Sequence, residues 1–317
     1  MEAMPLPLAK FIPVPERPWF FTFLIYCNFG RTIPLFMSIL NYINWDVSPS
    51  IFSIGSFEVR WYGLLFALAF VFGQRILTKI YVAEGRTEGD VDVITLYMII
   101  GTVVGARLGH TLFYQPEYYL SNPIEILKIW EGGLASHGAT IGILLALWLF
   151  SRKHKFDYMW VLDRIVIVVA LGGALIRLGN LMNSEIFGRP TDLPWGFIFL
   201  RQSEYSHVPR HPTQLYESFS VFLLFVLLYW LWKKYKEALP RGLLFGIFVT
   251  ALFSFRFMVE FLKEVQVAKE ETMALNIGQQ LSIPLILAGL VILFMVWRNP
   301  KPALAGGRLE REAVSKK

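Results

Sequence analysis

Apolar stretches long enough to cross a lipid bilayer recur along most of this 317-residue chain. A membrane-spanning helix needs about 20 predominantly apolar residues. Hydrophobic residues make up 55% of the chain and the mean hydropathy is +0.49, more than a soluble domain of this length needs to fill a core. The sequence therefore predicts an all-α polytopic membrane protein with seven transmembrane helices, at about 61–80, 91–113, 134–150, 159–180, 213–232, 242–262 and 279–297.

Basic residues are distributed unevenly between the two ends of the predicted spans. They gather after the first, third, fifth and seventh spans, whereas the alternate loops contain few, among them Lys128 and Lys263. The positive-inside rule places the basic ends in the cytoplasm, so the N-terminus of the core is expected outside and the C-terminus inside. The net charge of +6 then indicates topology and contact with anionic membrane lipids, and no nucleic-acid partner is expected.

The two ends of the chain differ in character from the apolar core. Residues 1–44 form an N-terminal extension, in which the interrupted apolar stretch 19–40 could be a poor extra span, an interfacial helix or a retained signal-like segment. The transmembrane domain is expected over 45–298, with a small irregular periplasmic head at about 181–211, where Gly, Pro and polar residues are dense. Residues 299–317 form a charged cytoplasmic tail. Because Cys27 is the single cysteine, no intrachain disulfide, cysteine-rich metal site or catalytic thiol is expected.

Two arginines, Arg177 and Arg256, lie inside apolar runs, where a charge is costly and usually functional. Asn180 follows Arg177 by three residues and Glu260 follows Arg256 by four, so each pair is expected to share one helix face. An arginine can grip a phosphate bidentately, which indicates an anionic lipid headgroup as the substrate. The alternatives are an interfacial arginine beside a capping asparagine for the first pair and a structural ion pair for the second.

Further polar residues stand near the predicted outer ends of the spans. His137 lies among small residues in GGLASHGATIG, which suits either proton transfer or a close helix contact. Asn183, Glu185 and Gly188 follow Arg177 in a polar run that packing does not readily explain. Tyr62 could be an interfacial aromatic or a hydroxyl of the site.

These residues fall in motifs that resemble the bacterial phosphatidylglycerol–prolipoprotein diacylglyceryl transferase family. The resemblance covers nearly everything after about residue 45, in the family's order. Its most specific parts are the patterns RLGNxxNxExxGR and HPxQLYE. The matching segments are RWYG at 60–63, GARLGHTLFY at 105–114, WEGGLASHG at 130–138, RLGNLMNSEIFGR at 177–189, HPTQLYE at 211–217, FRFMVEF at 255–261 and GQQLSIP at 278–284.

The resemblance implies a seven-span inner-membrane enzyme without a metal or cofactor. Its substrates would be phosphatidylglycerol and the lipobox segment of a prolipoprotein, whose cysteine thiol receives the diacylglyceryl group as glycerol phosphate leaves. Two positions depart from the family, since Ala139 replaces a frequent Gly and Leu252 a frequent Tyr. The resemblance implies catalytic roles for His137, Arg177 and Arg256, and substrate-binding roles for Tyr62, Asn180, Asn183, Glu185, Gly188 and Glu260.

The expected reaction needs a base for the thiol and fixed positive charge for the leaving phosphate oxygens. His137 is the candidate base, with a positioning role as its alternative, and the two arginines supply the charge. Two other classes of protein could carry the same arginines. An anion transporter often has internal repeats, which this sequence does not show, and a lipid-binding scaffold would not need His137.

Overall fold

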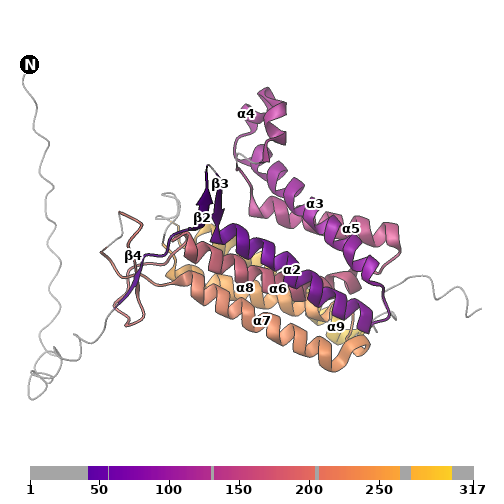
Figure 1. Cartoon of the computed structure of the whole chain (residues 1–317). Helices are drawn as coiled ribbons and strands as arrows, with labels where there is room; N and C mark the ends of the chain where they lie inside the picture. Colours follow the sequence, from indigo (N-terminus) through magenta and orange to yellow (C-terminus); the bar gives the residue numbers. More distant parts are fainter. Residues whose placement is uncertain (1–41, 56, 130–131, 204–206, 265–272, 302–317) are drawn as a thin grey trace, which may run out of the picture.

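Seven long helices form the body of the part of the chain that the structure describes (Figure 1). This computed structural model describes residues 42–301 except 56, 130–131, 204–206 and 265–272, so most of the predicted extension and tail lie outside it. Each long helix overlaps one of the predicted spans over most of its length, and consecutive helices alternate in direction. In the described ranges these helices are α2 (Trp61–Ala83), α3 (Glu88–Phe113), α5 (Ser136–His154), α6 (Tyr158–Met182), α7 (Thr213–Tyr235), α8 (Leu243–Val259) and α9 (Ile277–Arg298).

Six helical segments in the described residues are long and apolar enough to cross a membrane. The exception among the seven predicted spans is α5, which has 19 residues and carries Arg152, Lys153 and His154 in its last turn. Glycines at its other end lower its hydropathy further. A polytopic membrane protein is therefore confirmed, whereas the crossing by α5 stays a prediction.

Local sequence determines where several helices begin. At the start of α3, the Thr87 hydroxyl accepts from the Asp90 backbone N–H and the Asp90 carboxylate accepts from Thr87, forming a capping box. Asn276 and Gln279 form the same box at the start of α9. These reciprocal bonds satisfy backbone donors that a helix N-terminus otherwise leaves unpaired.

Helix α6 is the centre of the apolar core, and its first half is almost entirely buried. A charged pair lies within this core, where the Arg164 guanidinium contacts the Glu84 carboxylate at 2.9 Å and neither side chain is exposed. The indole N–H groups of Trp160 and Trp232 also donate to Glu84, at 3.0 and 2.6 Å. A buried charge is tolerated only when it is paired and hydrogen-bonded. These contacts join α2, α6 and α7 at the end of the bundle opposite the head.

Helices α3 and α5 pack against each other through small residues. A Cβ added to Gly105 would lie 2.4 Å from the Gly138 carbonyl oxygen, and one added to Gly142 would lie 2.1 Å from that of Gly101. The backbones thus approach as closely as in small-xxx-small membrane helix pairs. The pair diverges from the other helices toward α4 (Pro116–Ser121), as Figure 1 shows.

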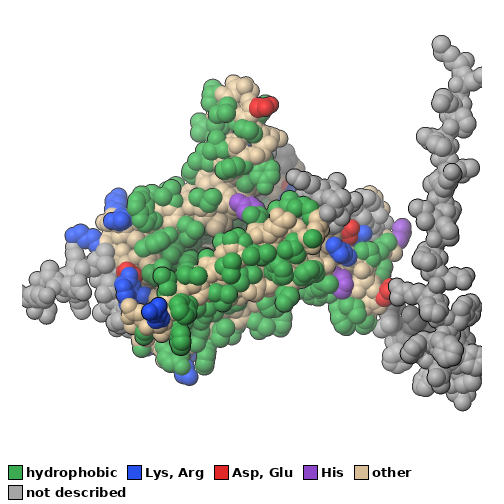
Figure 2. Space-filling view, turned by 180° about the vertical axis from the view of Figure 1, so that it is seen from behind, with side chains coloured by type: hydrophobic (Ala, Val, Ile, Leu, Met, Phe, Trp, Pro, Cys, Tyr) green, Lys and Arg blue, Asp and Glu red, His purple; other side chains and the backbone are tan. Residues whose placement is uncertain are grey.

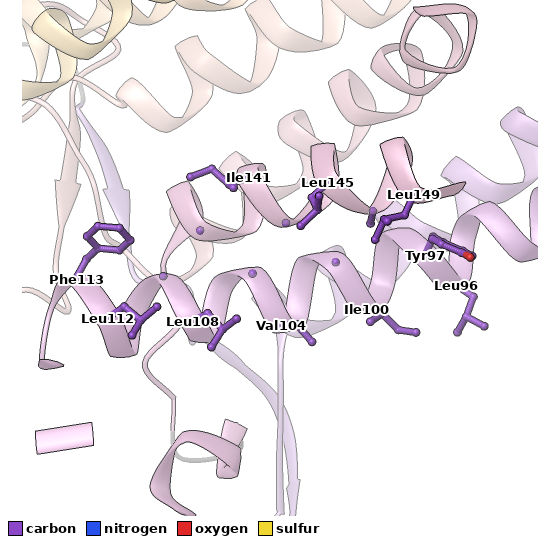
Figure 3. Close-up of a pocket in the computed structure, with 16 residues that line it drawn as sticks. Leu96, Tyr97, Ile100, Val104, Leu108, Leu112, Phe113, Ile141, Leu145 and Leu149 are labelled. Carbon is purple, nitrogen blue, oxygen red and sulfur yellow. The ribbon is translucent and has the colours of Figure 1, made fainter. Parts of the chain in front are cut away.

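An apolar groove of about 440 Å³ runs along this helix pair. Figure 3 shows aliphatic side chains of both helices along it, including Val104, Leu108 and Leu145. None of its lining residues is charged, so the groove supplies no charge for phosphate binding.

The head end contains short strands as well as loops, so the fold is mostly helical rather than entirely so. Strand β1 (Ile43–Trp45) pairs in parallel with β4 (Phe197–Phe199), and β2 (Ser50–Ile54) pairs antiparallel with β3 (Phe57–Arg60). Strand β1 straddles the predicted boundary between extension and core. Within the predicted head, Phe197 and Phe199 pack with Leu181 into a small separate cluster.

Charge and hydrophobicity are segregated along the body. Figure 2 shows hydrophobic side chains over most of the visible helical surface, with Lys and Arg side chains near the helix ends. The last turns of α5, α7 and α9 all carry basic residues, at the end of the body opposite the head. This distribution suits a protein whose apolar belt faces lipid.

Candidate functional site

Arg177 is the centre of a polar cluster where α6 approaches the head. Its Nη1 donates to Oδ1 of Asn180 at 3.2 Å, one turn along the same helix, as the spacing predicted. Its Nε lies 2.8 Å from Oε2 of Glu217 on α7. Among the described residues no acceptor pairs with Nη2, and the side chain is 22% exposed. The arginine is therefore held on two sides and keeps one donor group for a ligand.

Glu185 connects Arg177's helix to the head. Its Oε1 accepts from Nδ2 of Asn180 at 2.7 Å and from Nδ2 of Asn183 at 3.3 Å. The residues on either side, Ser184 and Ile186, have φ angles of 53° and 59°. A β-branched residue such as Ile in this left-handed region is strained, and such strain tends to occur at functional sites. The backbone here is thus bent to direct the Glu185 carboxylate toward the two asparagines.

A chain of alternating charges extends the cluster away from Arg177. Nζ of Lys263 lies 2.8 Å from Oε1 of Glu217 and 3.1 Å from Oε2 of Glu260. The sequence predicted a role for Glu260, whereas Lys263 was expected to be an ordinary charge in a loop. Its side chain is only 4% exposed, so it belongs to the buried cluster.

Among the described residues, Arg256 and Glu260 do not form the ion pair that their spacing of four residues suggests. Helix α8 tightens after Val259 into the 3₁₀ turn η4 (Glu260–Leu262), where side chains three residues apart eclipse one another. Glu260 therefore pairs with Lys263, three residues on. Within the described part of the chain Arg256 forms no ion pair, and its side chain is half-buried.

Gly188 lies where three segments cross. A Cβ there would lie 2.6 Å from the Cβ of His211, 2.6 Å from the Leu262 carbonyl oxygen and 2.8 Å from Cγ2 of Thr213. Its N–H donates to the His211 carbonyl at 2.8 Å. The glycine is needed for this close approach, which holds the segment after Glu185 against the ends of α7 and α8.

His211 is partly buried beside this crossing. Its Nδ1 lies 3.3 Å from the Tyr216 hydroxyl, and this hydroxyl accepts a hydrogen bond from Nε1 of Trp195 at 2.9 Å. Burial lowers the pKa of the His211 imidazole below its usual value. Burial therefore disfavours the charged imidazolium at this position.

Tyr62 connects the cluster to a mostly apolar cavity. The cavity, about 560 Å³, lies between α2, α3, α5 and α6. Tyr62 and Ile176 line its head-side end, and Ile176 directly precedes Arg177. The ring of Tyr62 packs against Gly179, where a Cβ would lie 2.8 Å from Cδ2. A volume of this size is typical of small-molecule sites.

His137 is not joined to this cluster by any hydrogen bond or ion pair among the described residues. It is the second residue of α5 and its side chain is exposed. Its neighbours Ser136, Ala139 and Thr140 line the cavity, so His137 stands beside the cavity wall. The structure thus brings together five of the predicted site residues: Arg177, Asn180, Asn183, Glu185 and Tyr62. Glu260 is connected to them through Lys263 and Glu217. Among the described residues, His137 and Arg256 have no hydrogen bond or ion pair to this group. Within the described residues, no three His, Cys, Asp or Glu side chains are grouped to hold a metal ion.

An apolar helical body and an arginine-centred cluster beside an apolar cavity define a polytopic membrane protein suited to an amphiphile with an anionic group. The chain belongs to the prolipoprotein diacylglyceryl transferase family, whose sequence model matches residues 49–295. The resemblance noted in the motifs is therefore confirmed.

Relatives with established names cover most of the chain. It is 50% identical over 252 residues to the phosphatidylglycerol–prolipoprotein diacylglyceryl transferase of Tolumonas auensis, covering 79% of this chain and 96% of that protein. The protein of the same name from Chloroherpeton thalassium is 49% identical over 262 residues, covering 81% and 96%. That from Cupriavidus metallidurans is 37% identical over 266 residues, covering 82% and 97%.

Proposed function

We propose that this chain transfers the diacylglyceryl group of phosphatidylglycerol to the lipobox cysteine thiol of a prolipoprotein, with a thioether and glycerol phosphate as products. The names of its relatives support the reaction. The structural observation that carries the proposal is Arg177, which keeps its Nη2 group available beside the head-side end of the cavity.

The cavity and the arginine suit the two parts of a phospholipid. The apolar walls of α2, α3, α5 and α6 would receive acyl chains, while Arg177 binds the phosphate. Asn180 and Glu217 fix the guanidinium in one orientation before the lipid arrives. Such preorganisation lowers the cost of stabilising charge that develops on the leaving oxygens. Arg256 would add a second positive charge from α8.

The chemical step is a substitution at the glycerol carbon that carries the phosphate. The thiolate forms the new carbon–sulfur bond as the carbon–oxygen bond to phosphate breaks, and the electron pair leaves with glycerol phosphate. The reacting species is the thiolate, so a base must accept the thiol proton. We assign this role to His137, which stands beside the cavity wall.

The orientation in the membrane follows from the basic residues. We place the protein in the bacterial inner membrane, with the head in the periplasm and the C-terminus in the cytoplasm. In this placement α5 crosses the membrane in addition to the six long apolar helices, which gives seven crossings. The basic last turns of α5, α7 and α9, opposite the head, support this placement.

Purified protein in phosphatidylglycerol vesicles, given a lipobox peptide, tests the proposal. Mass spectrometry should detect a thioether-linked diacylglyceryl peptide together with an equal amount of glycerol phosphate. A peptide with serine in place of its cysteine is the substrate control, and folded Arg177→Gln protein is the enzyme control. Lipid binding without a thioether product would indicate a scaffold, and anion flux without one would indicate a transporter; either result would refute the proposal.

A further inference from the structure

Lys263 is a buried lysine shared by two carboxylates. It directly follows η4, and its side chain is 4% exposed, a depth at which lysine is rarely found unless paired. Its Nζ contacts Glu217 at 2.8 Å and Glu260 at 3.1 Å. Burying this ammonium costs free energy that a solvent-exposed loop lysine would not incur, so its position calls for a specific role.

The backbone around Lys263 holds the residue in place. Its carbonyl oxygen accepts from Nε of Arg189 at 3.1 Å, and the carbonyl of Leu262 accepts from the Arg189 N–H at 2.8 Å. An isolated β-bridge pairs Lys263 with Gly188. The lysine is thus fastened to the segment that follows Glu185, and its side chain is directed into the cluster.

Glu217 divides its two oxygens between opposite partners. Oε2 contacts Nε of Arg177, and Oε1 contacts Nζ of Lys263, both at 2.8 Å. With Glu260, the four side chains carry two positive and two negative charges. Without Lys263 the set would have a net negative charge, and the whole charge of Glu217 would act on Arg177. Both changes would weaken binding of a phosphate, because charges interact strongly where water is excluded.

We propose that Lys263 is a positioning residue for phospholipid binding: it offsets the charge of Glu217, so that Glu217 orients Arg177 without competing with the lipid phosphate for it. The inference rests on the proposed function. It assigns Lys263 an action through Glu217 rather than a contact with the substrate.

Charge balance makes the inference testable through three variants. Lys263→Gln should lower kcat/KM for phosphatidylglycerol about tenfold or more, mainly through a higher KM. Lys263→Arg keeps the charge and should stay within about threefold of the unmodified protein. The double variant Glu217→Gln with Lys263→Gln restores zero net charge among the four positions. The glutamine amide oxygen at position 217 can still accept from Arg177 and orient it, so KM should recover toward the unmodified value. A purely structural role predicts the opposite, since the double variant removes more buried contacts.

Lys128→Gln is the matched control, because Lys128 also pairs with a glutamate three residues away, Glu125, but is 34% exposed. A normal KM for Lys263→Gln, or a double variant no better than the single one, would overturn the inference. If Lys263→Gln does not accumulate, the double variant decides: KM within about threefold supports the inference and a tenfold rise refutes it. Product formation by the unmodified protein in the same assay separates failure of this inference from failure of the proposed function.

Discussion

The ring of Tyr62 packs directly against the backbone of Gly179, where a Cβ would lie 2.8 Å from its Cδ2 and 3.3 Å from its Cα. This contact holds the tyrosine between the cavity and the polar cluster, two residues along α6 from Arg177. The close fit explains why a glycine, although a weak helix former, stands inside α6 at this point.

Gly179→Ala should therefore displace Tyr62 and lower diacylglyceryl transfer about tenfold or more, since small misplacements in a site are costly. Alanine favours helices, so the loss would not arise from a weaker α6. Initial rates at equal amounts of folded protein provide the measurement. Gly89→Ala is the control, because Gly89 also stands in a helix, lies outside the lining of the cavity, and its Cβ would meet only Oγ1 of Thr87 at an ordinary 3.8 Å. Equal rates for the two variants would show that the position of Tyr62 does not matter.

Arg177→Lys should be severely impaired although the charge is kept. A lysine has no planar fork with which to contact Asn180, Glu217 and a phosphate together. We expect kcat/KM for phosphatidylglycerol to fall by about 100-fold or more. Arg256→Lys should also be impaired if Arg256 contacts the leaving group directly. Near-normal turnover by both variants at equal protein levels would mean that positive potential alone suffices.

Glu84→Gln should destabilise the fold, because it removes the closer counter-charge of the buried Arg164 and leaves Asp163, whose Oδ2 lies 3.9 Å from Nη1, as the remaining carboxylate. Breaking a buried pair in this way typically costs about 3–5 kcal/mol. Thermal unfolding in detergent should show a clearly lower midpoint. Glu58→Gln removes the exposed partner of Arg60 and should change the midpoint little. A Glu84→Gln midpoint equal to that of Glu58→Gln would show that the buried pair is dispensable.

Hydrophobic pattern was sufficient to predict the positions of the long helices, because each apolar run is long and ends in polar residues. Helical spacing also predicted the contact between Arg177 and Asn180, which lie within one regular helix. The same rule failed for Arg256 and Glu260. There the helix tightens into a 3₁₀ turn, which local spacing did not reveal.

The role of Lys263 in the buried cluster could not be predicted from the sequence, because it depends on contacts between segments that are distant along the chain. In the sequence it is one of the charges beyond the sixth span, and such charges are normally solvated. It is buried because the segment around Gly188 pairs with the end of α8 and covers it. Its spacing of three from Glu260 and its place after the FRFMVEF motif were the only local signals.

The proposed topology predicts that the head is accessible from the periplasm. In a Cys27→Ser background, Asp192→Cys should react with a membrane-impermeant maleimide in intact cells, because Asp192 is an exposed residue of the head. Lys153→Cys, in the last turn of α5, should react only after the membrane is opened. Labelling in the reverse pattern would invert the orientation, and labelling of both sites in intact cells would show that α6, which lies between them, does not cross the membrane.

His137→Gln should lose transfer while it still binds phosphatidylglycerol, because the cluster around Arg177 has no hydrogen bond or ion pair to His137 among the described residues. General-base catalysis is worth about 10²–10⁴ in rate, so a loss of this size is expected at pH 7. Alkaline buffer should partly restore the rate, since a free thiol titrates at about pH 8.5 and then supplies thiolate without the base. His154→Gln, at the other end of the same helix, should keep normal activity. Undiminished transfer by His137→Gln at pH 7 would remove this histidine from the mechanism, and loss of lipid binding would reassign it to holding the substrate.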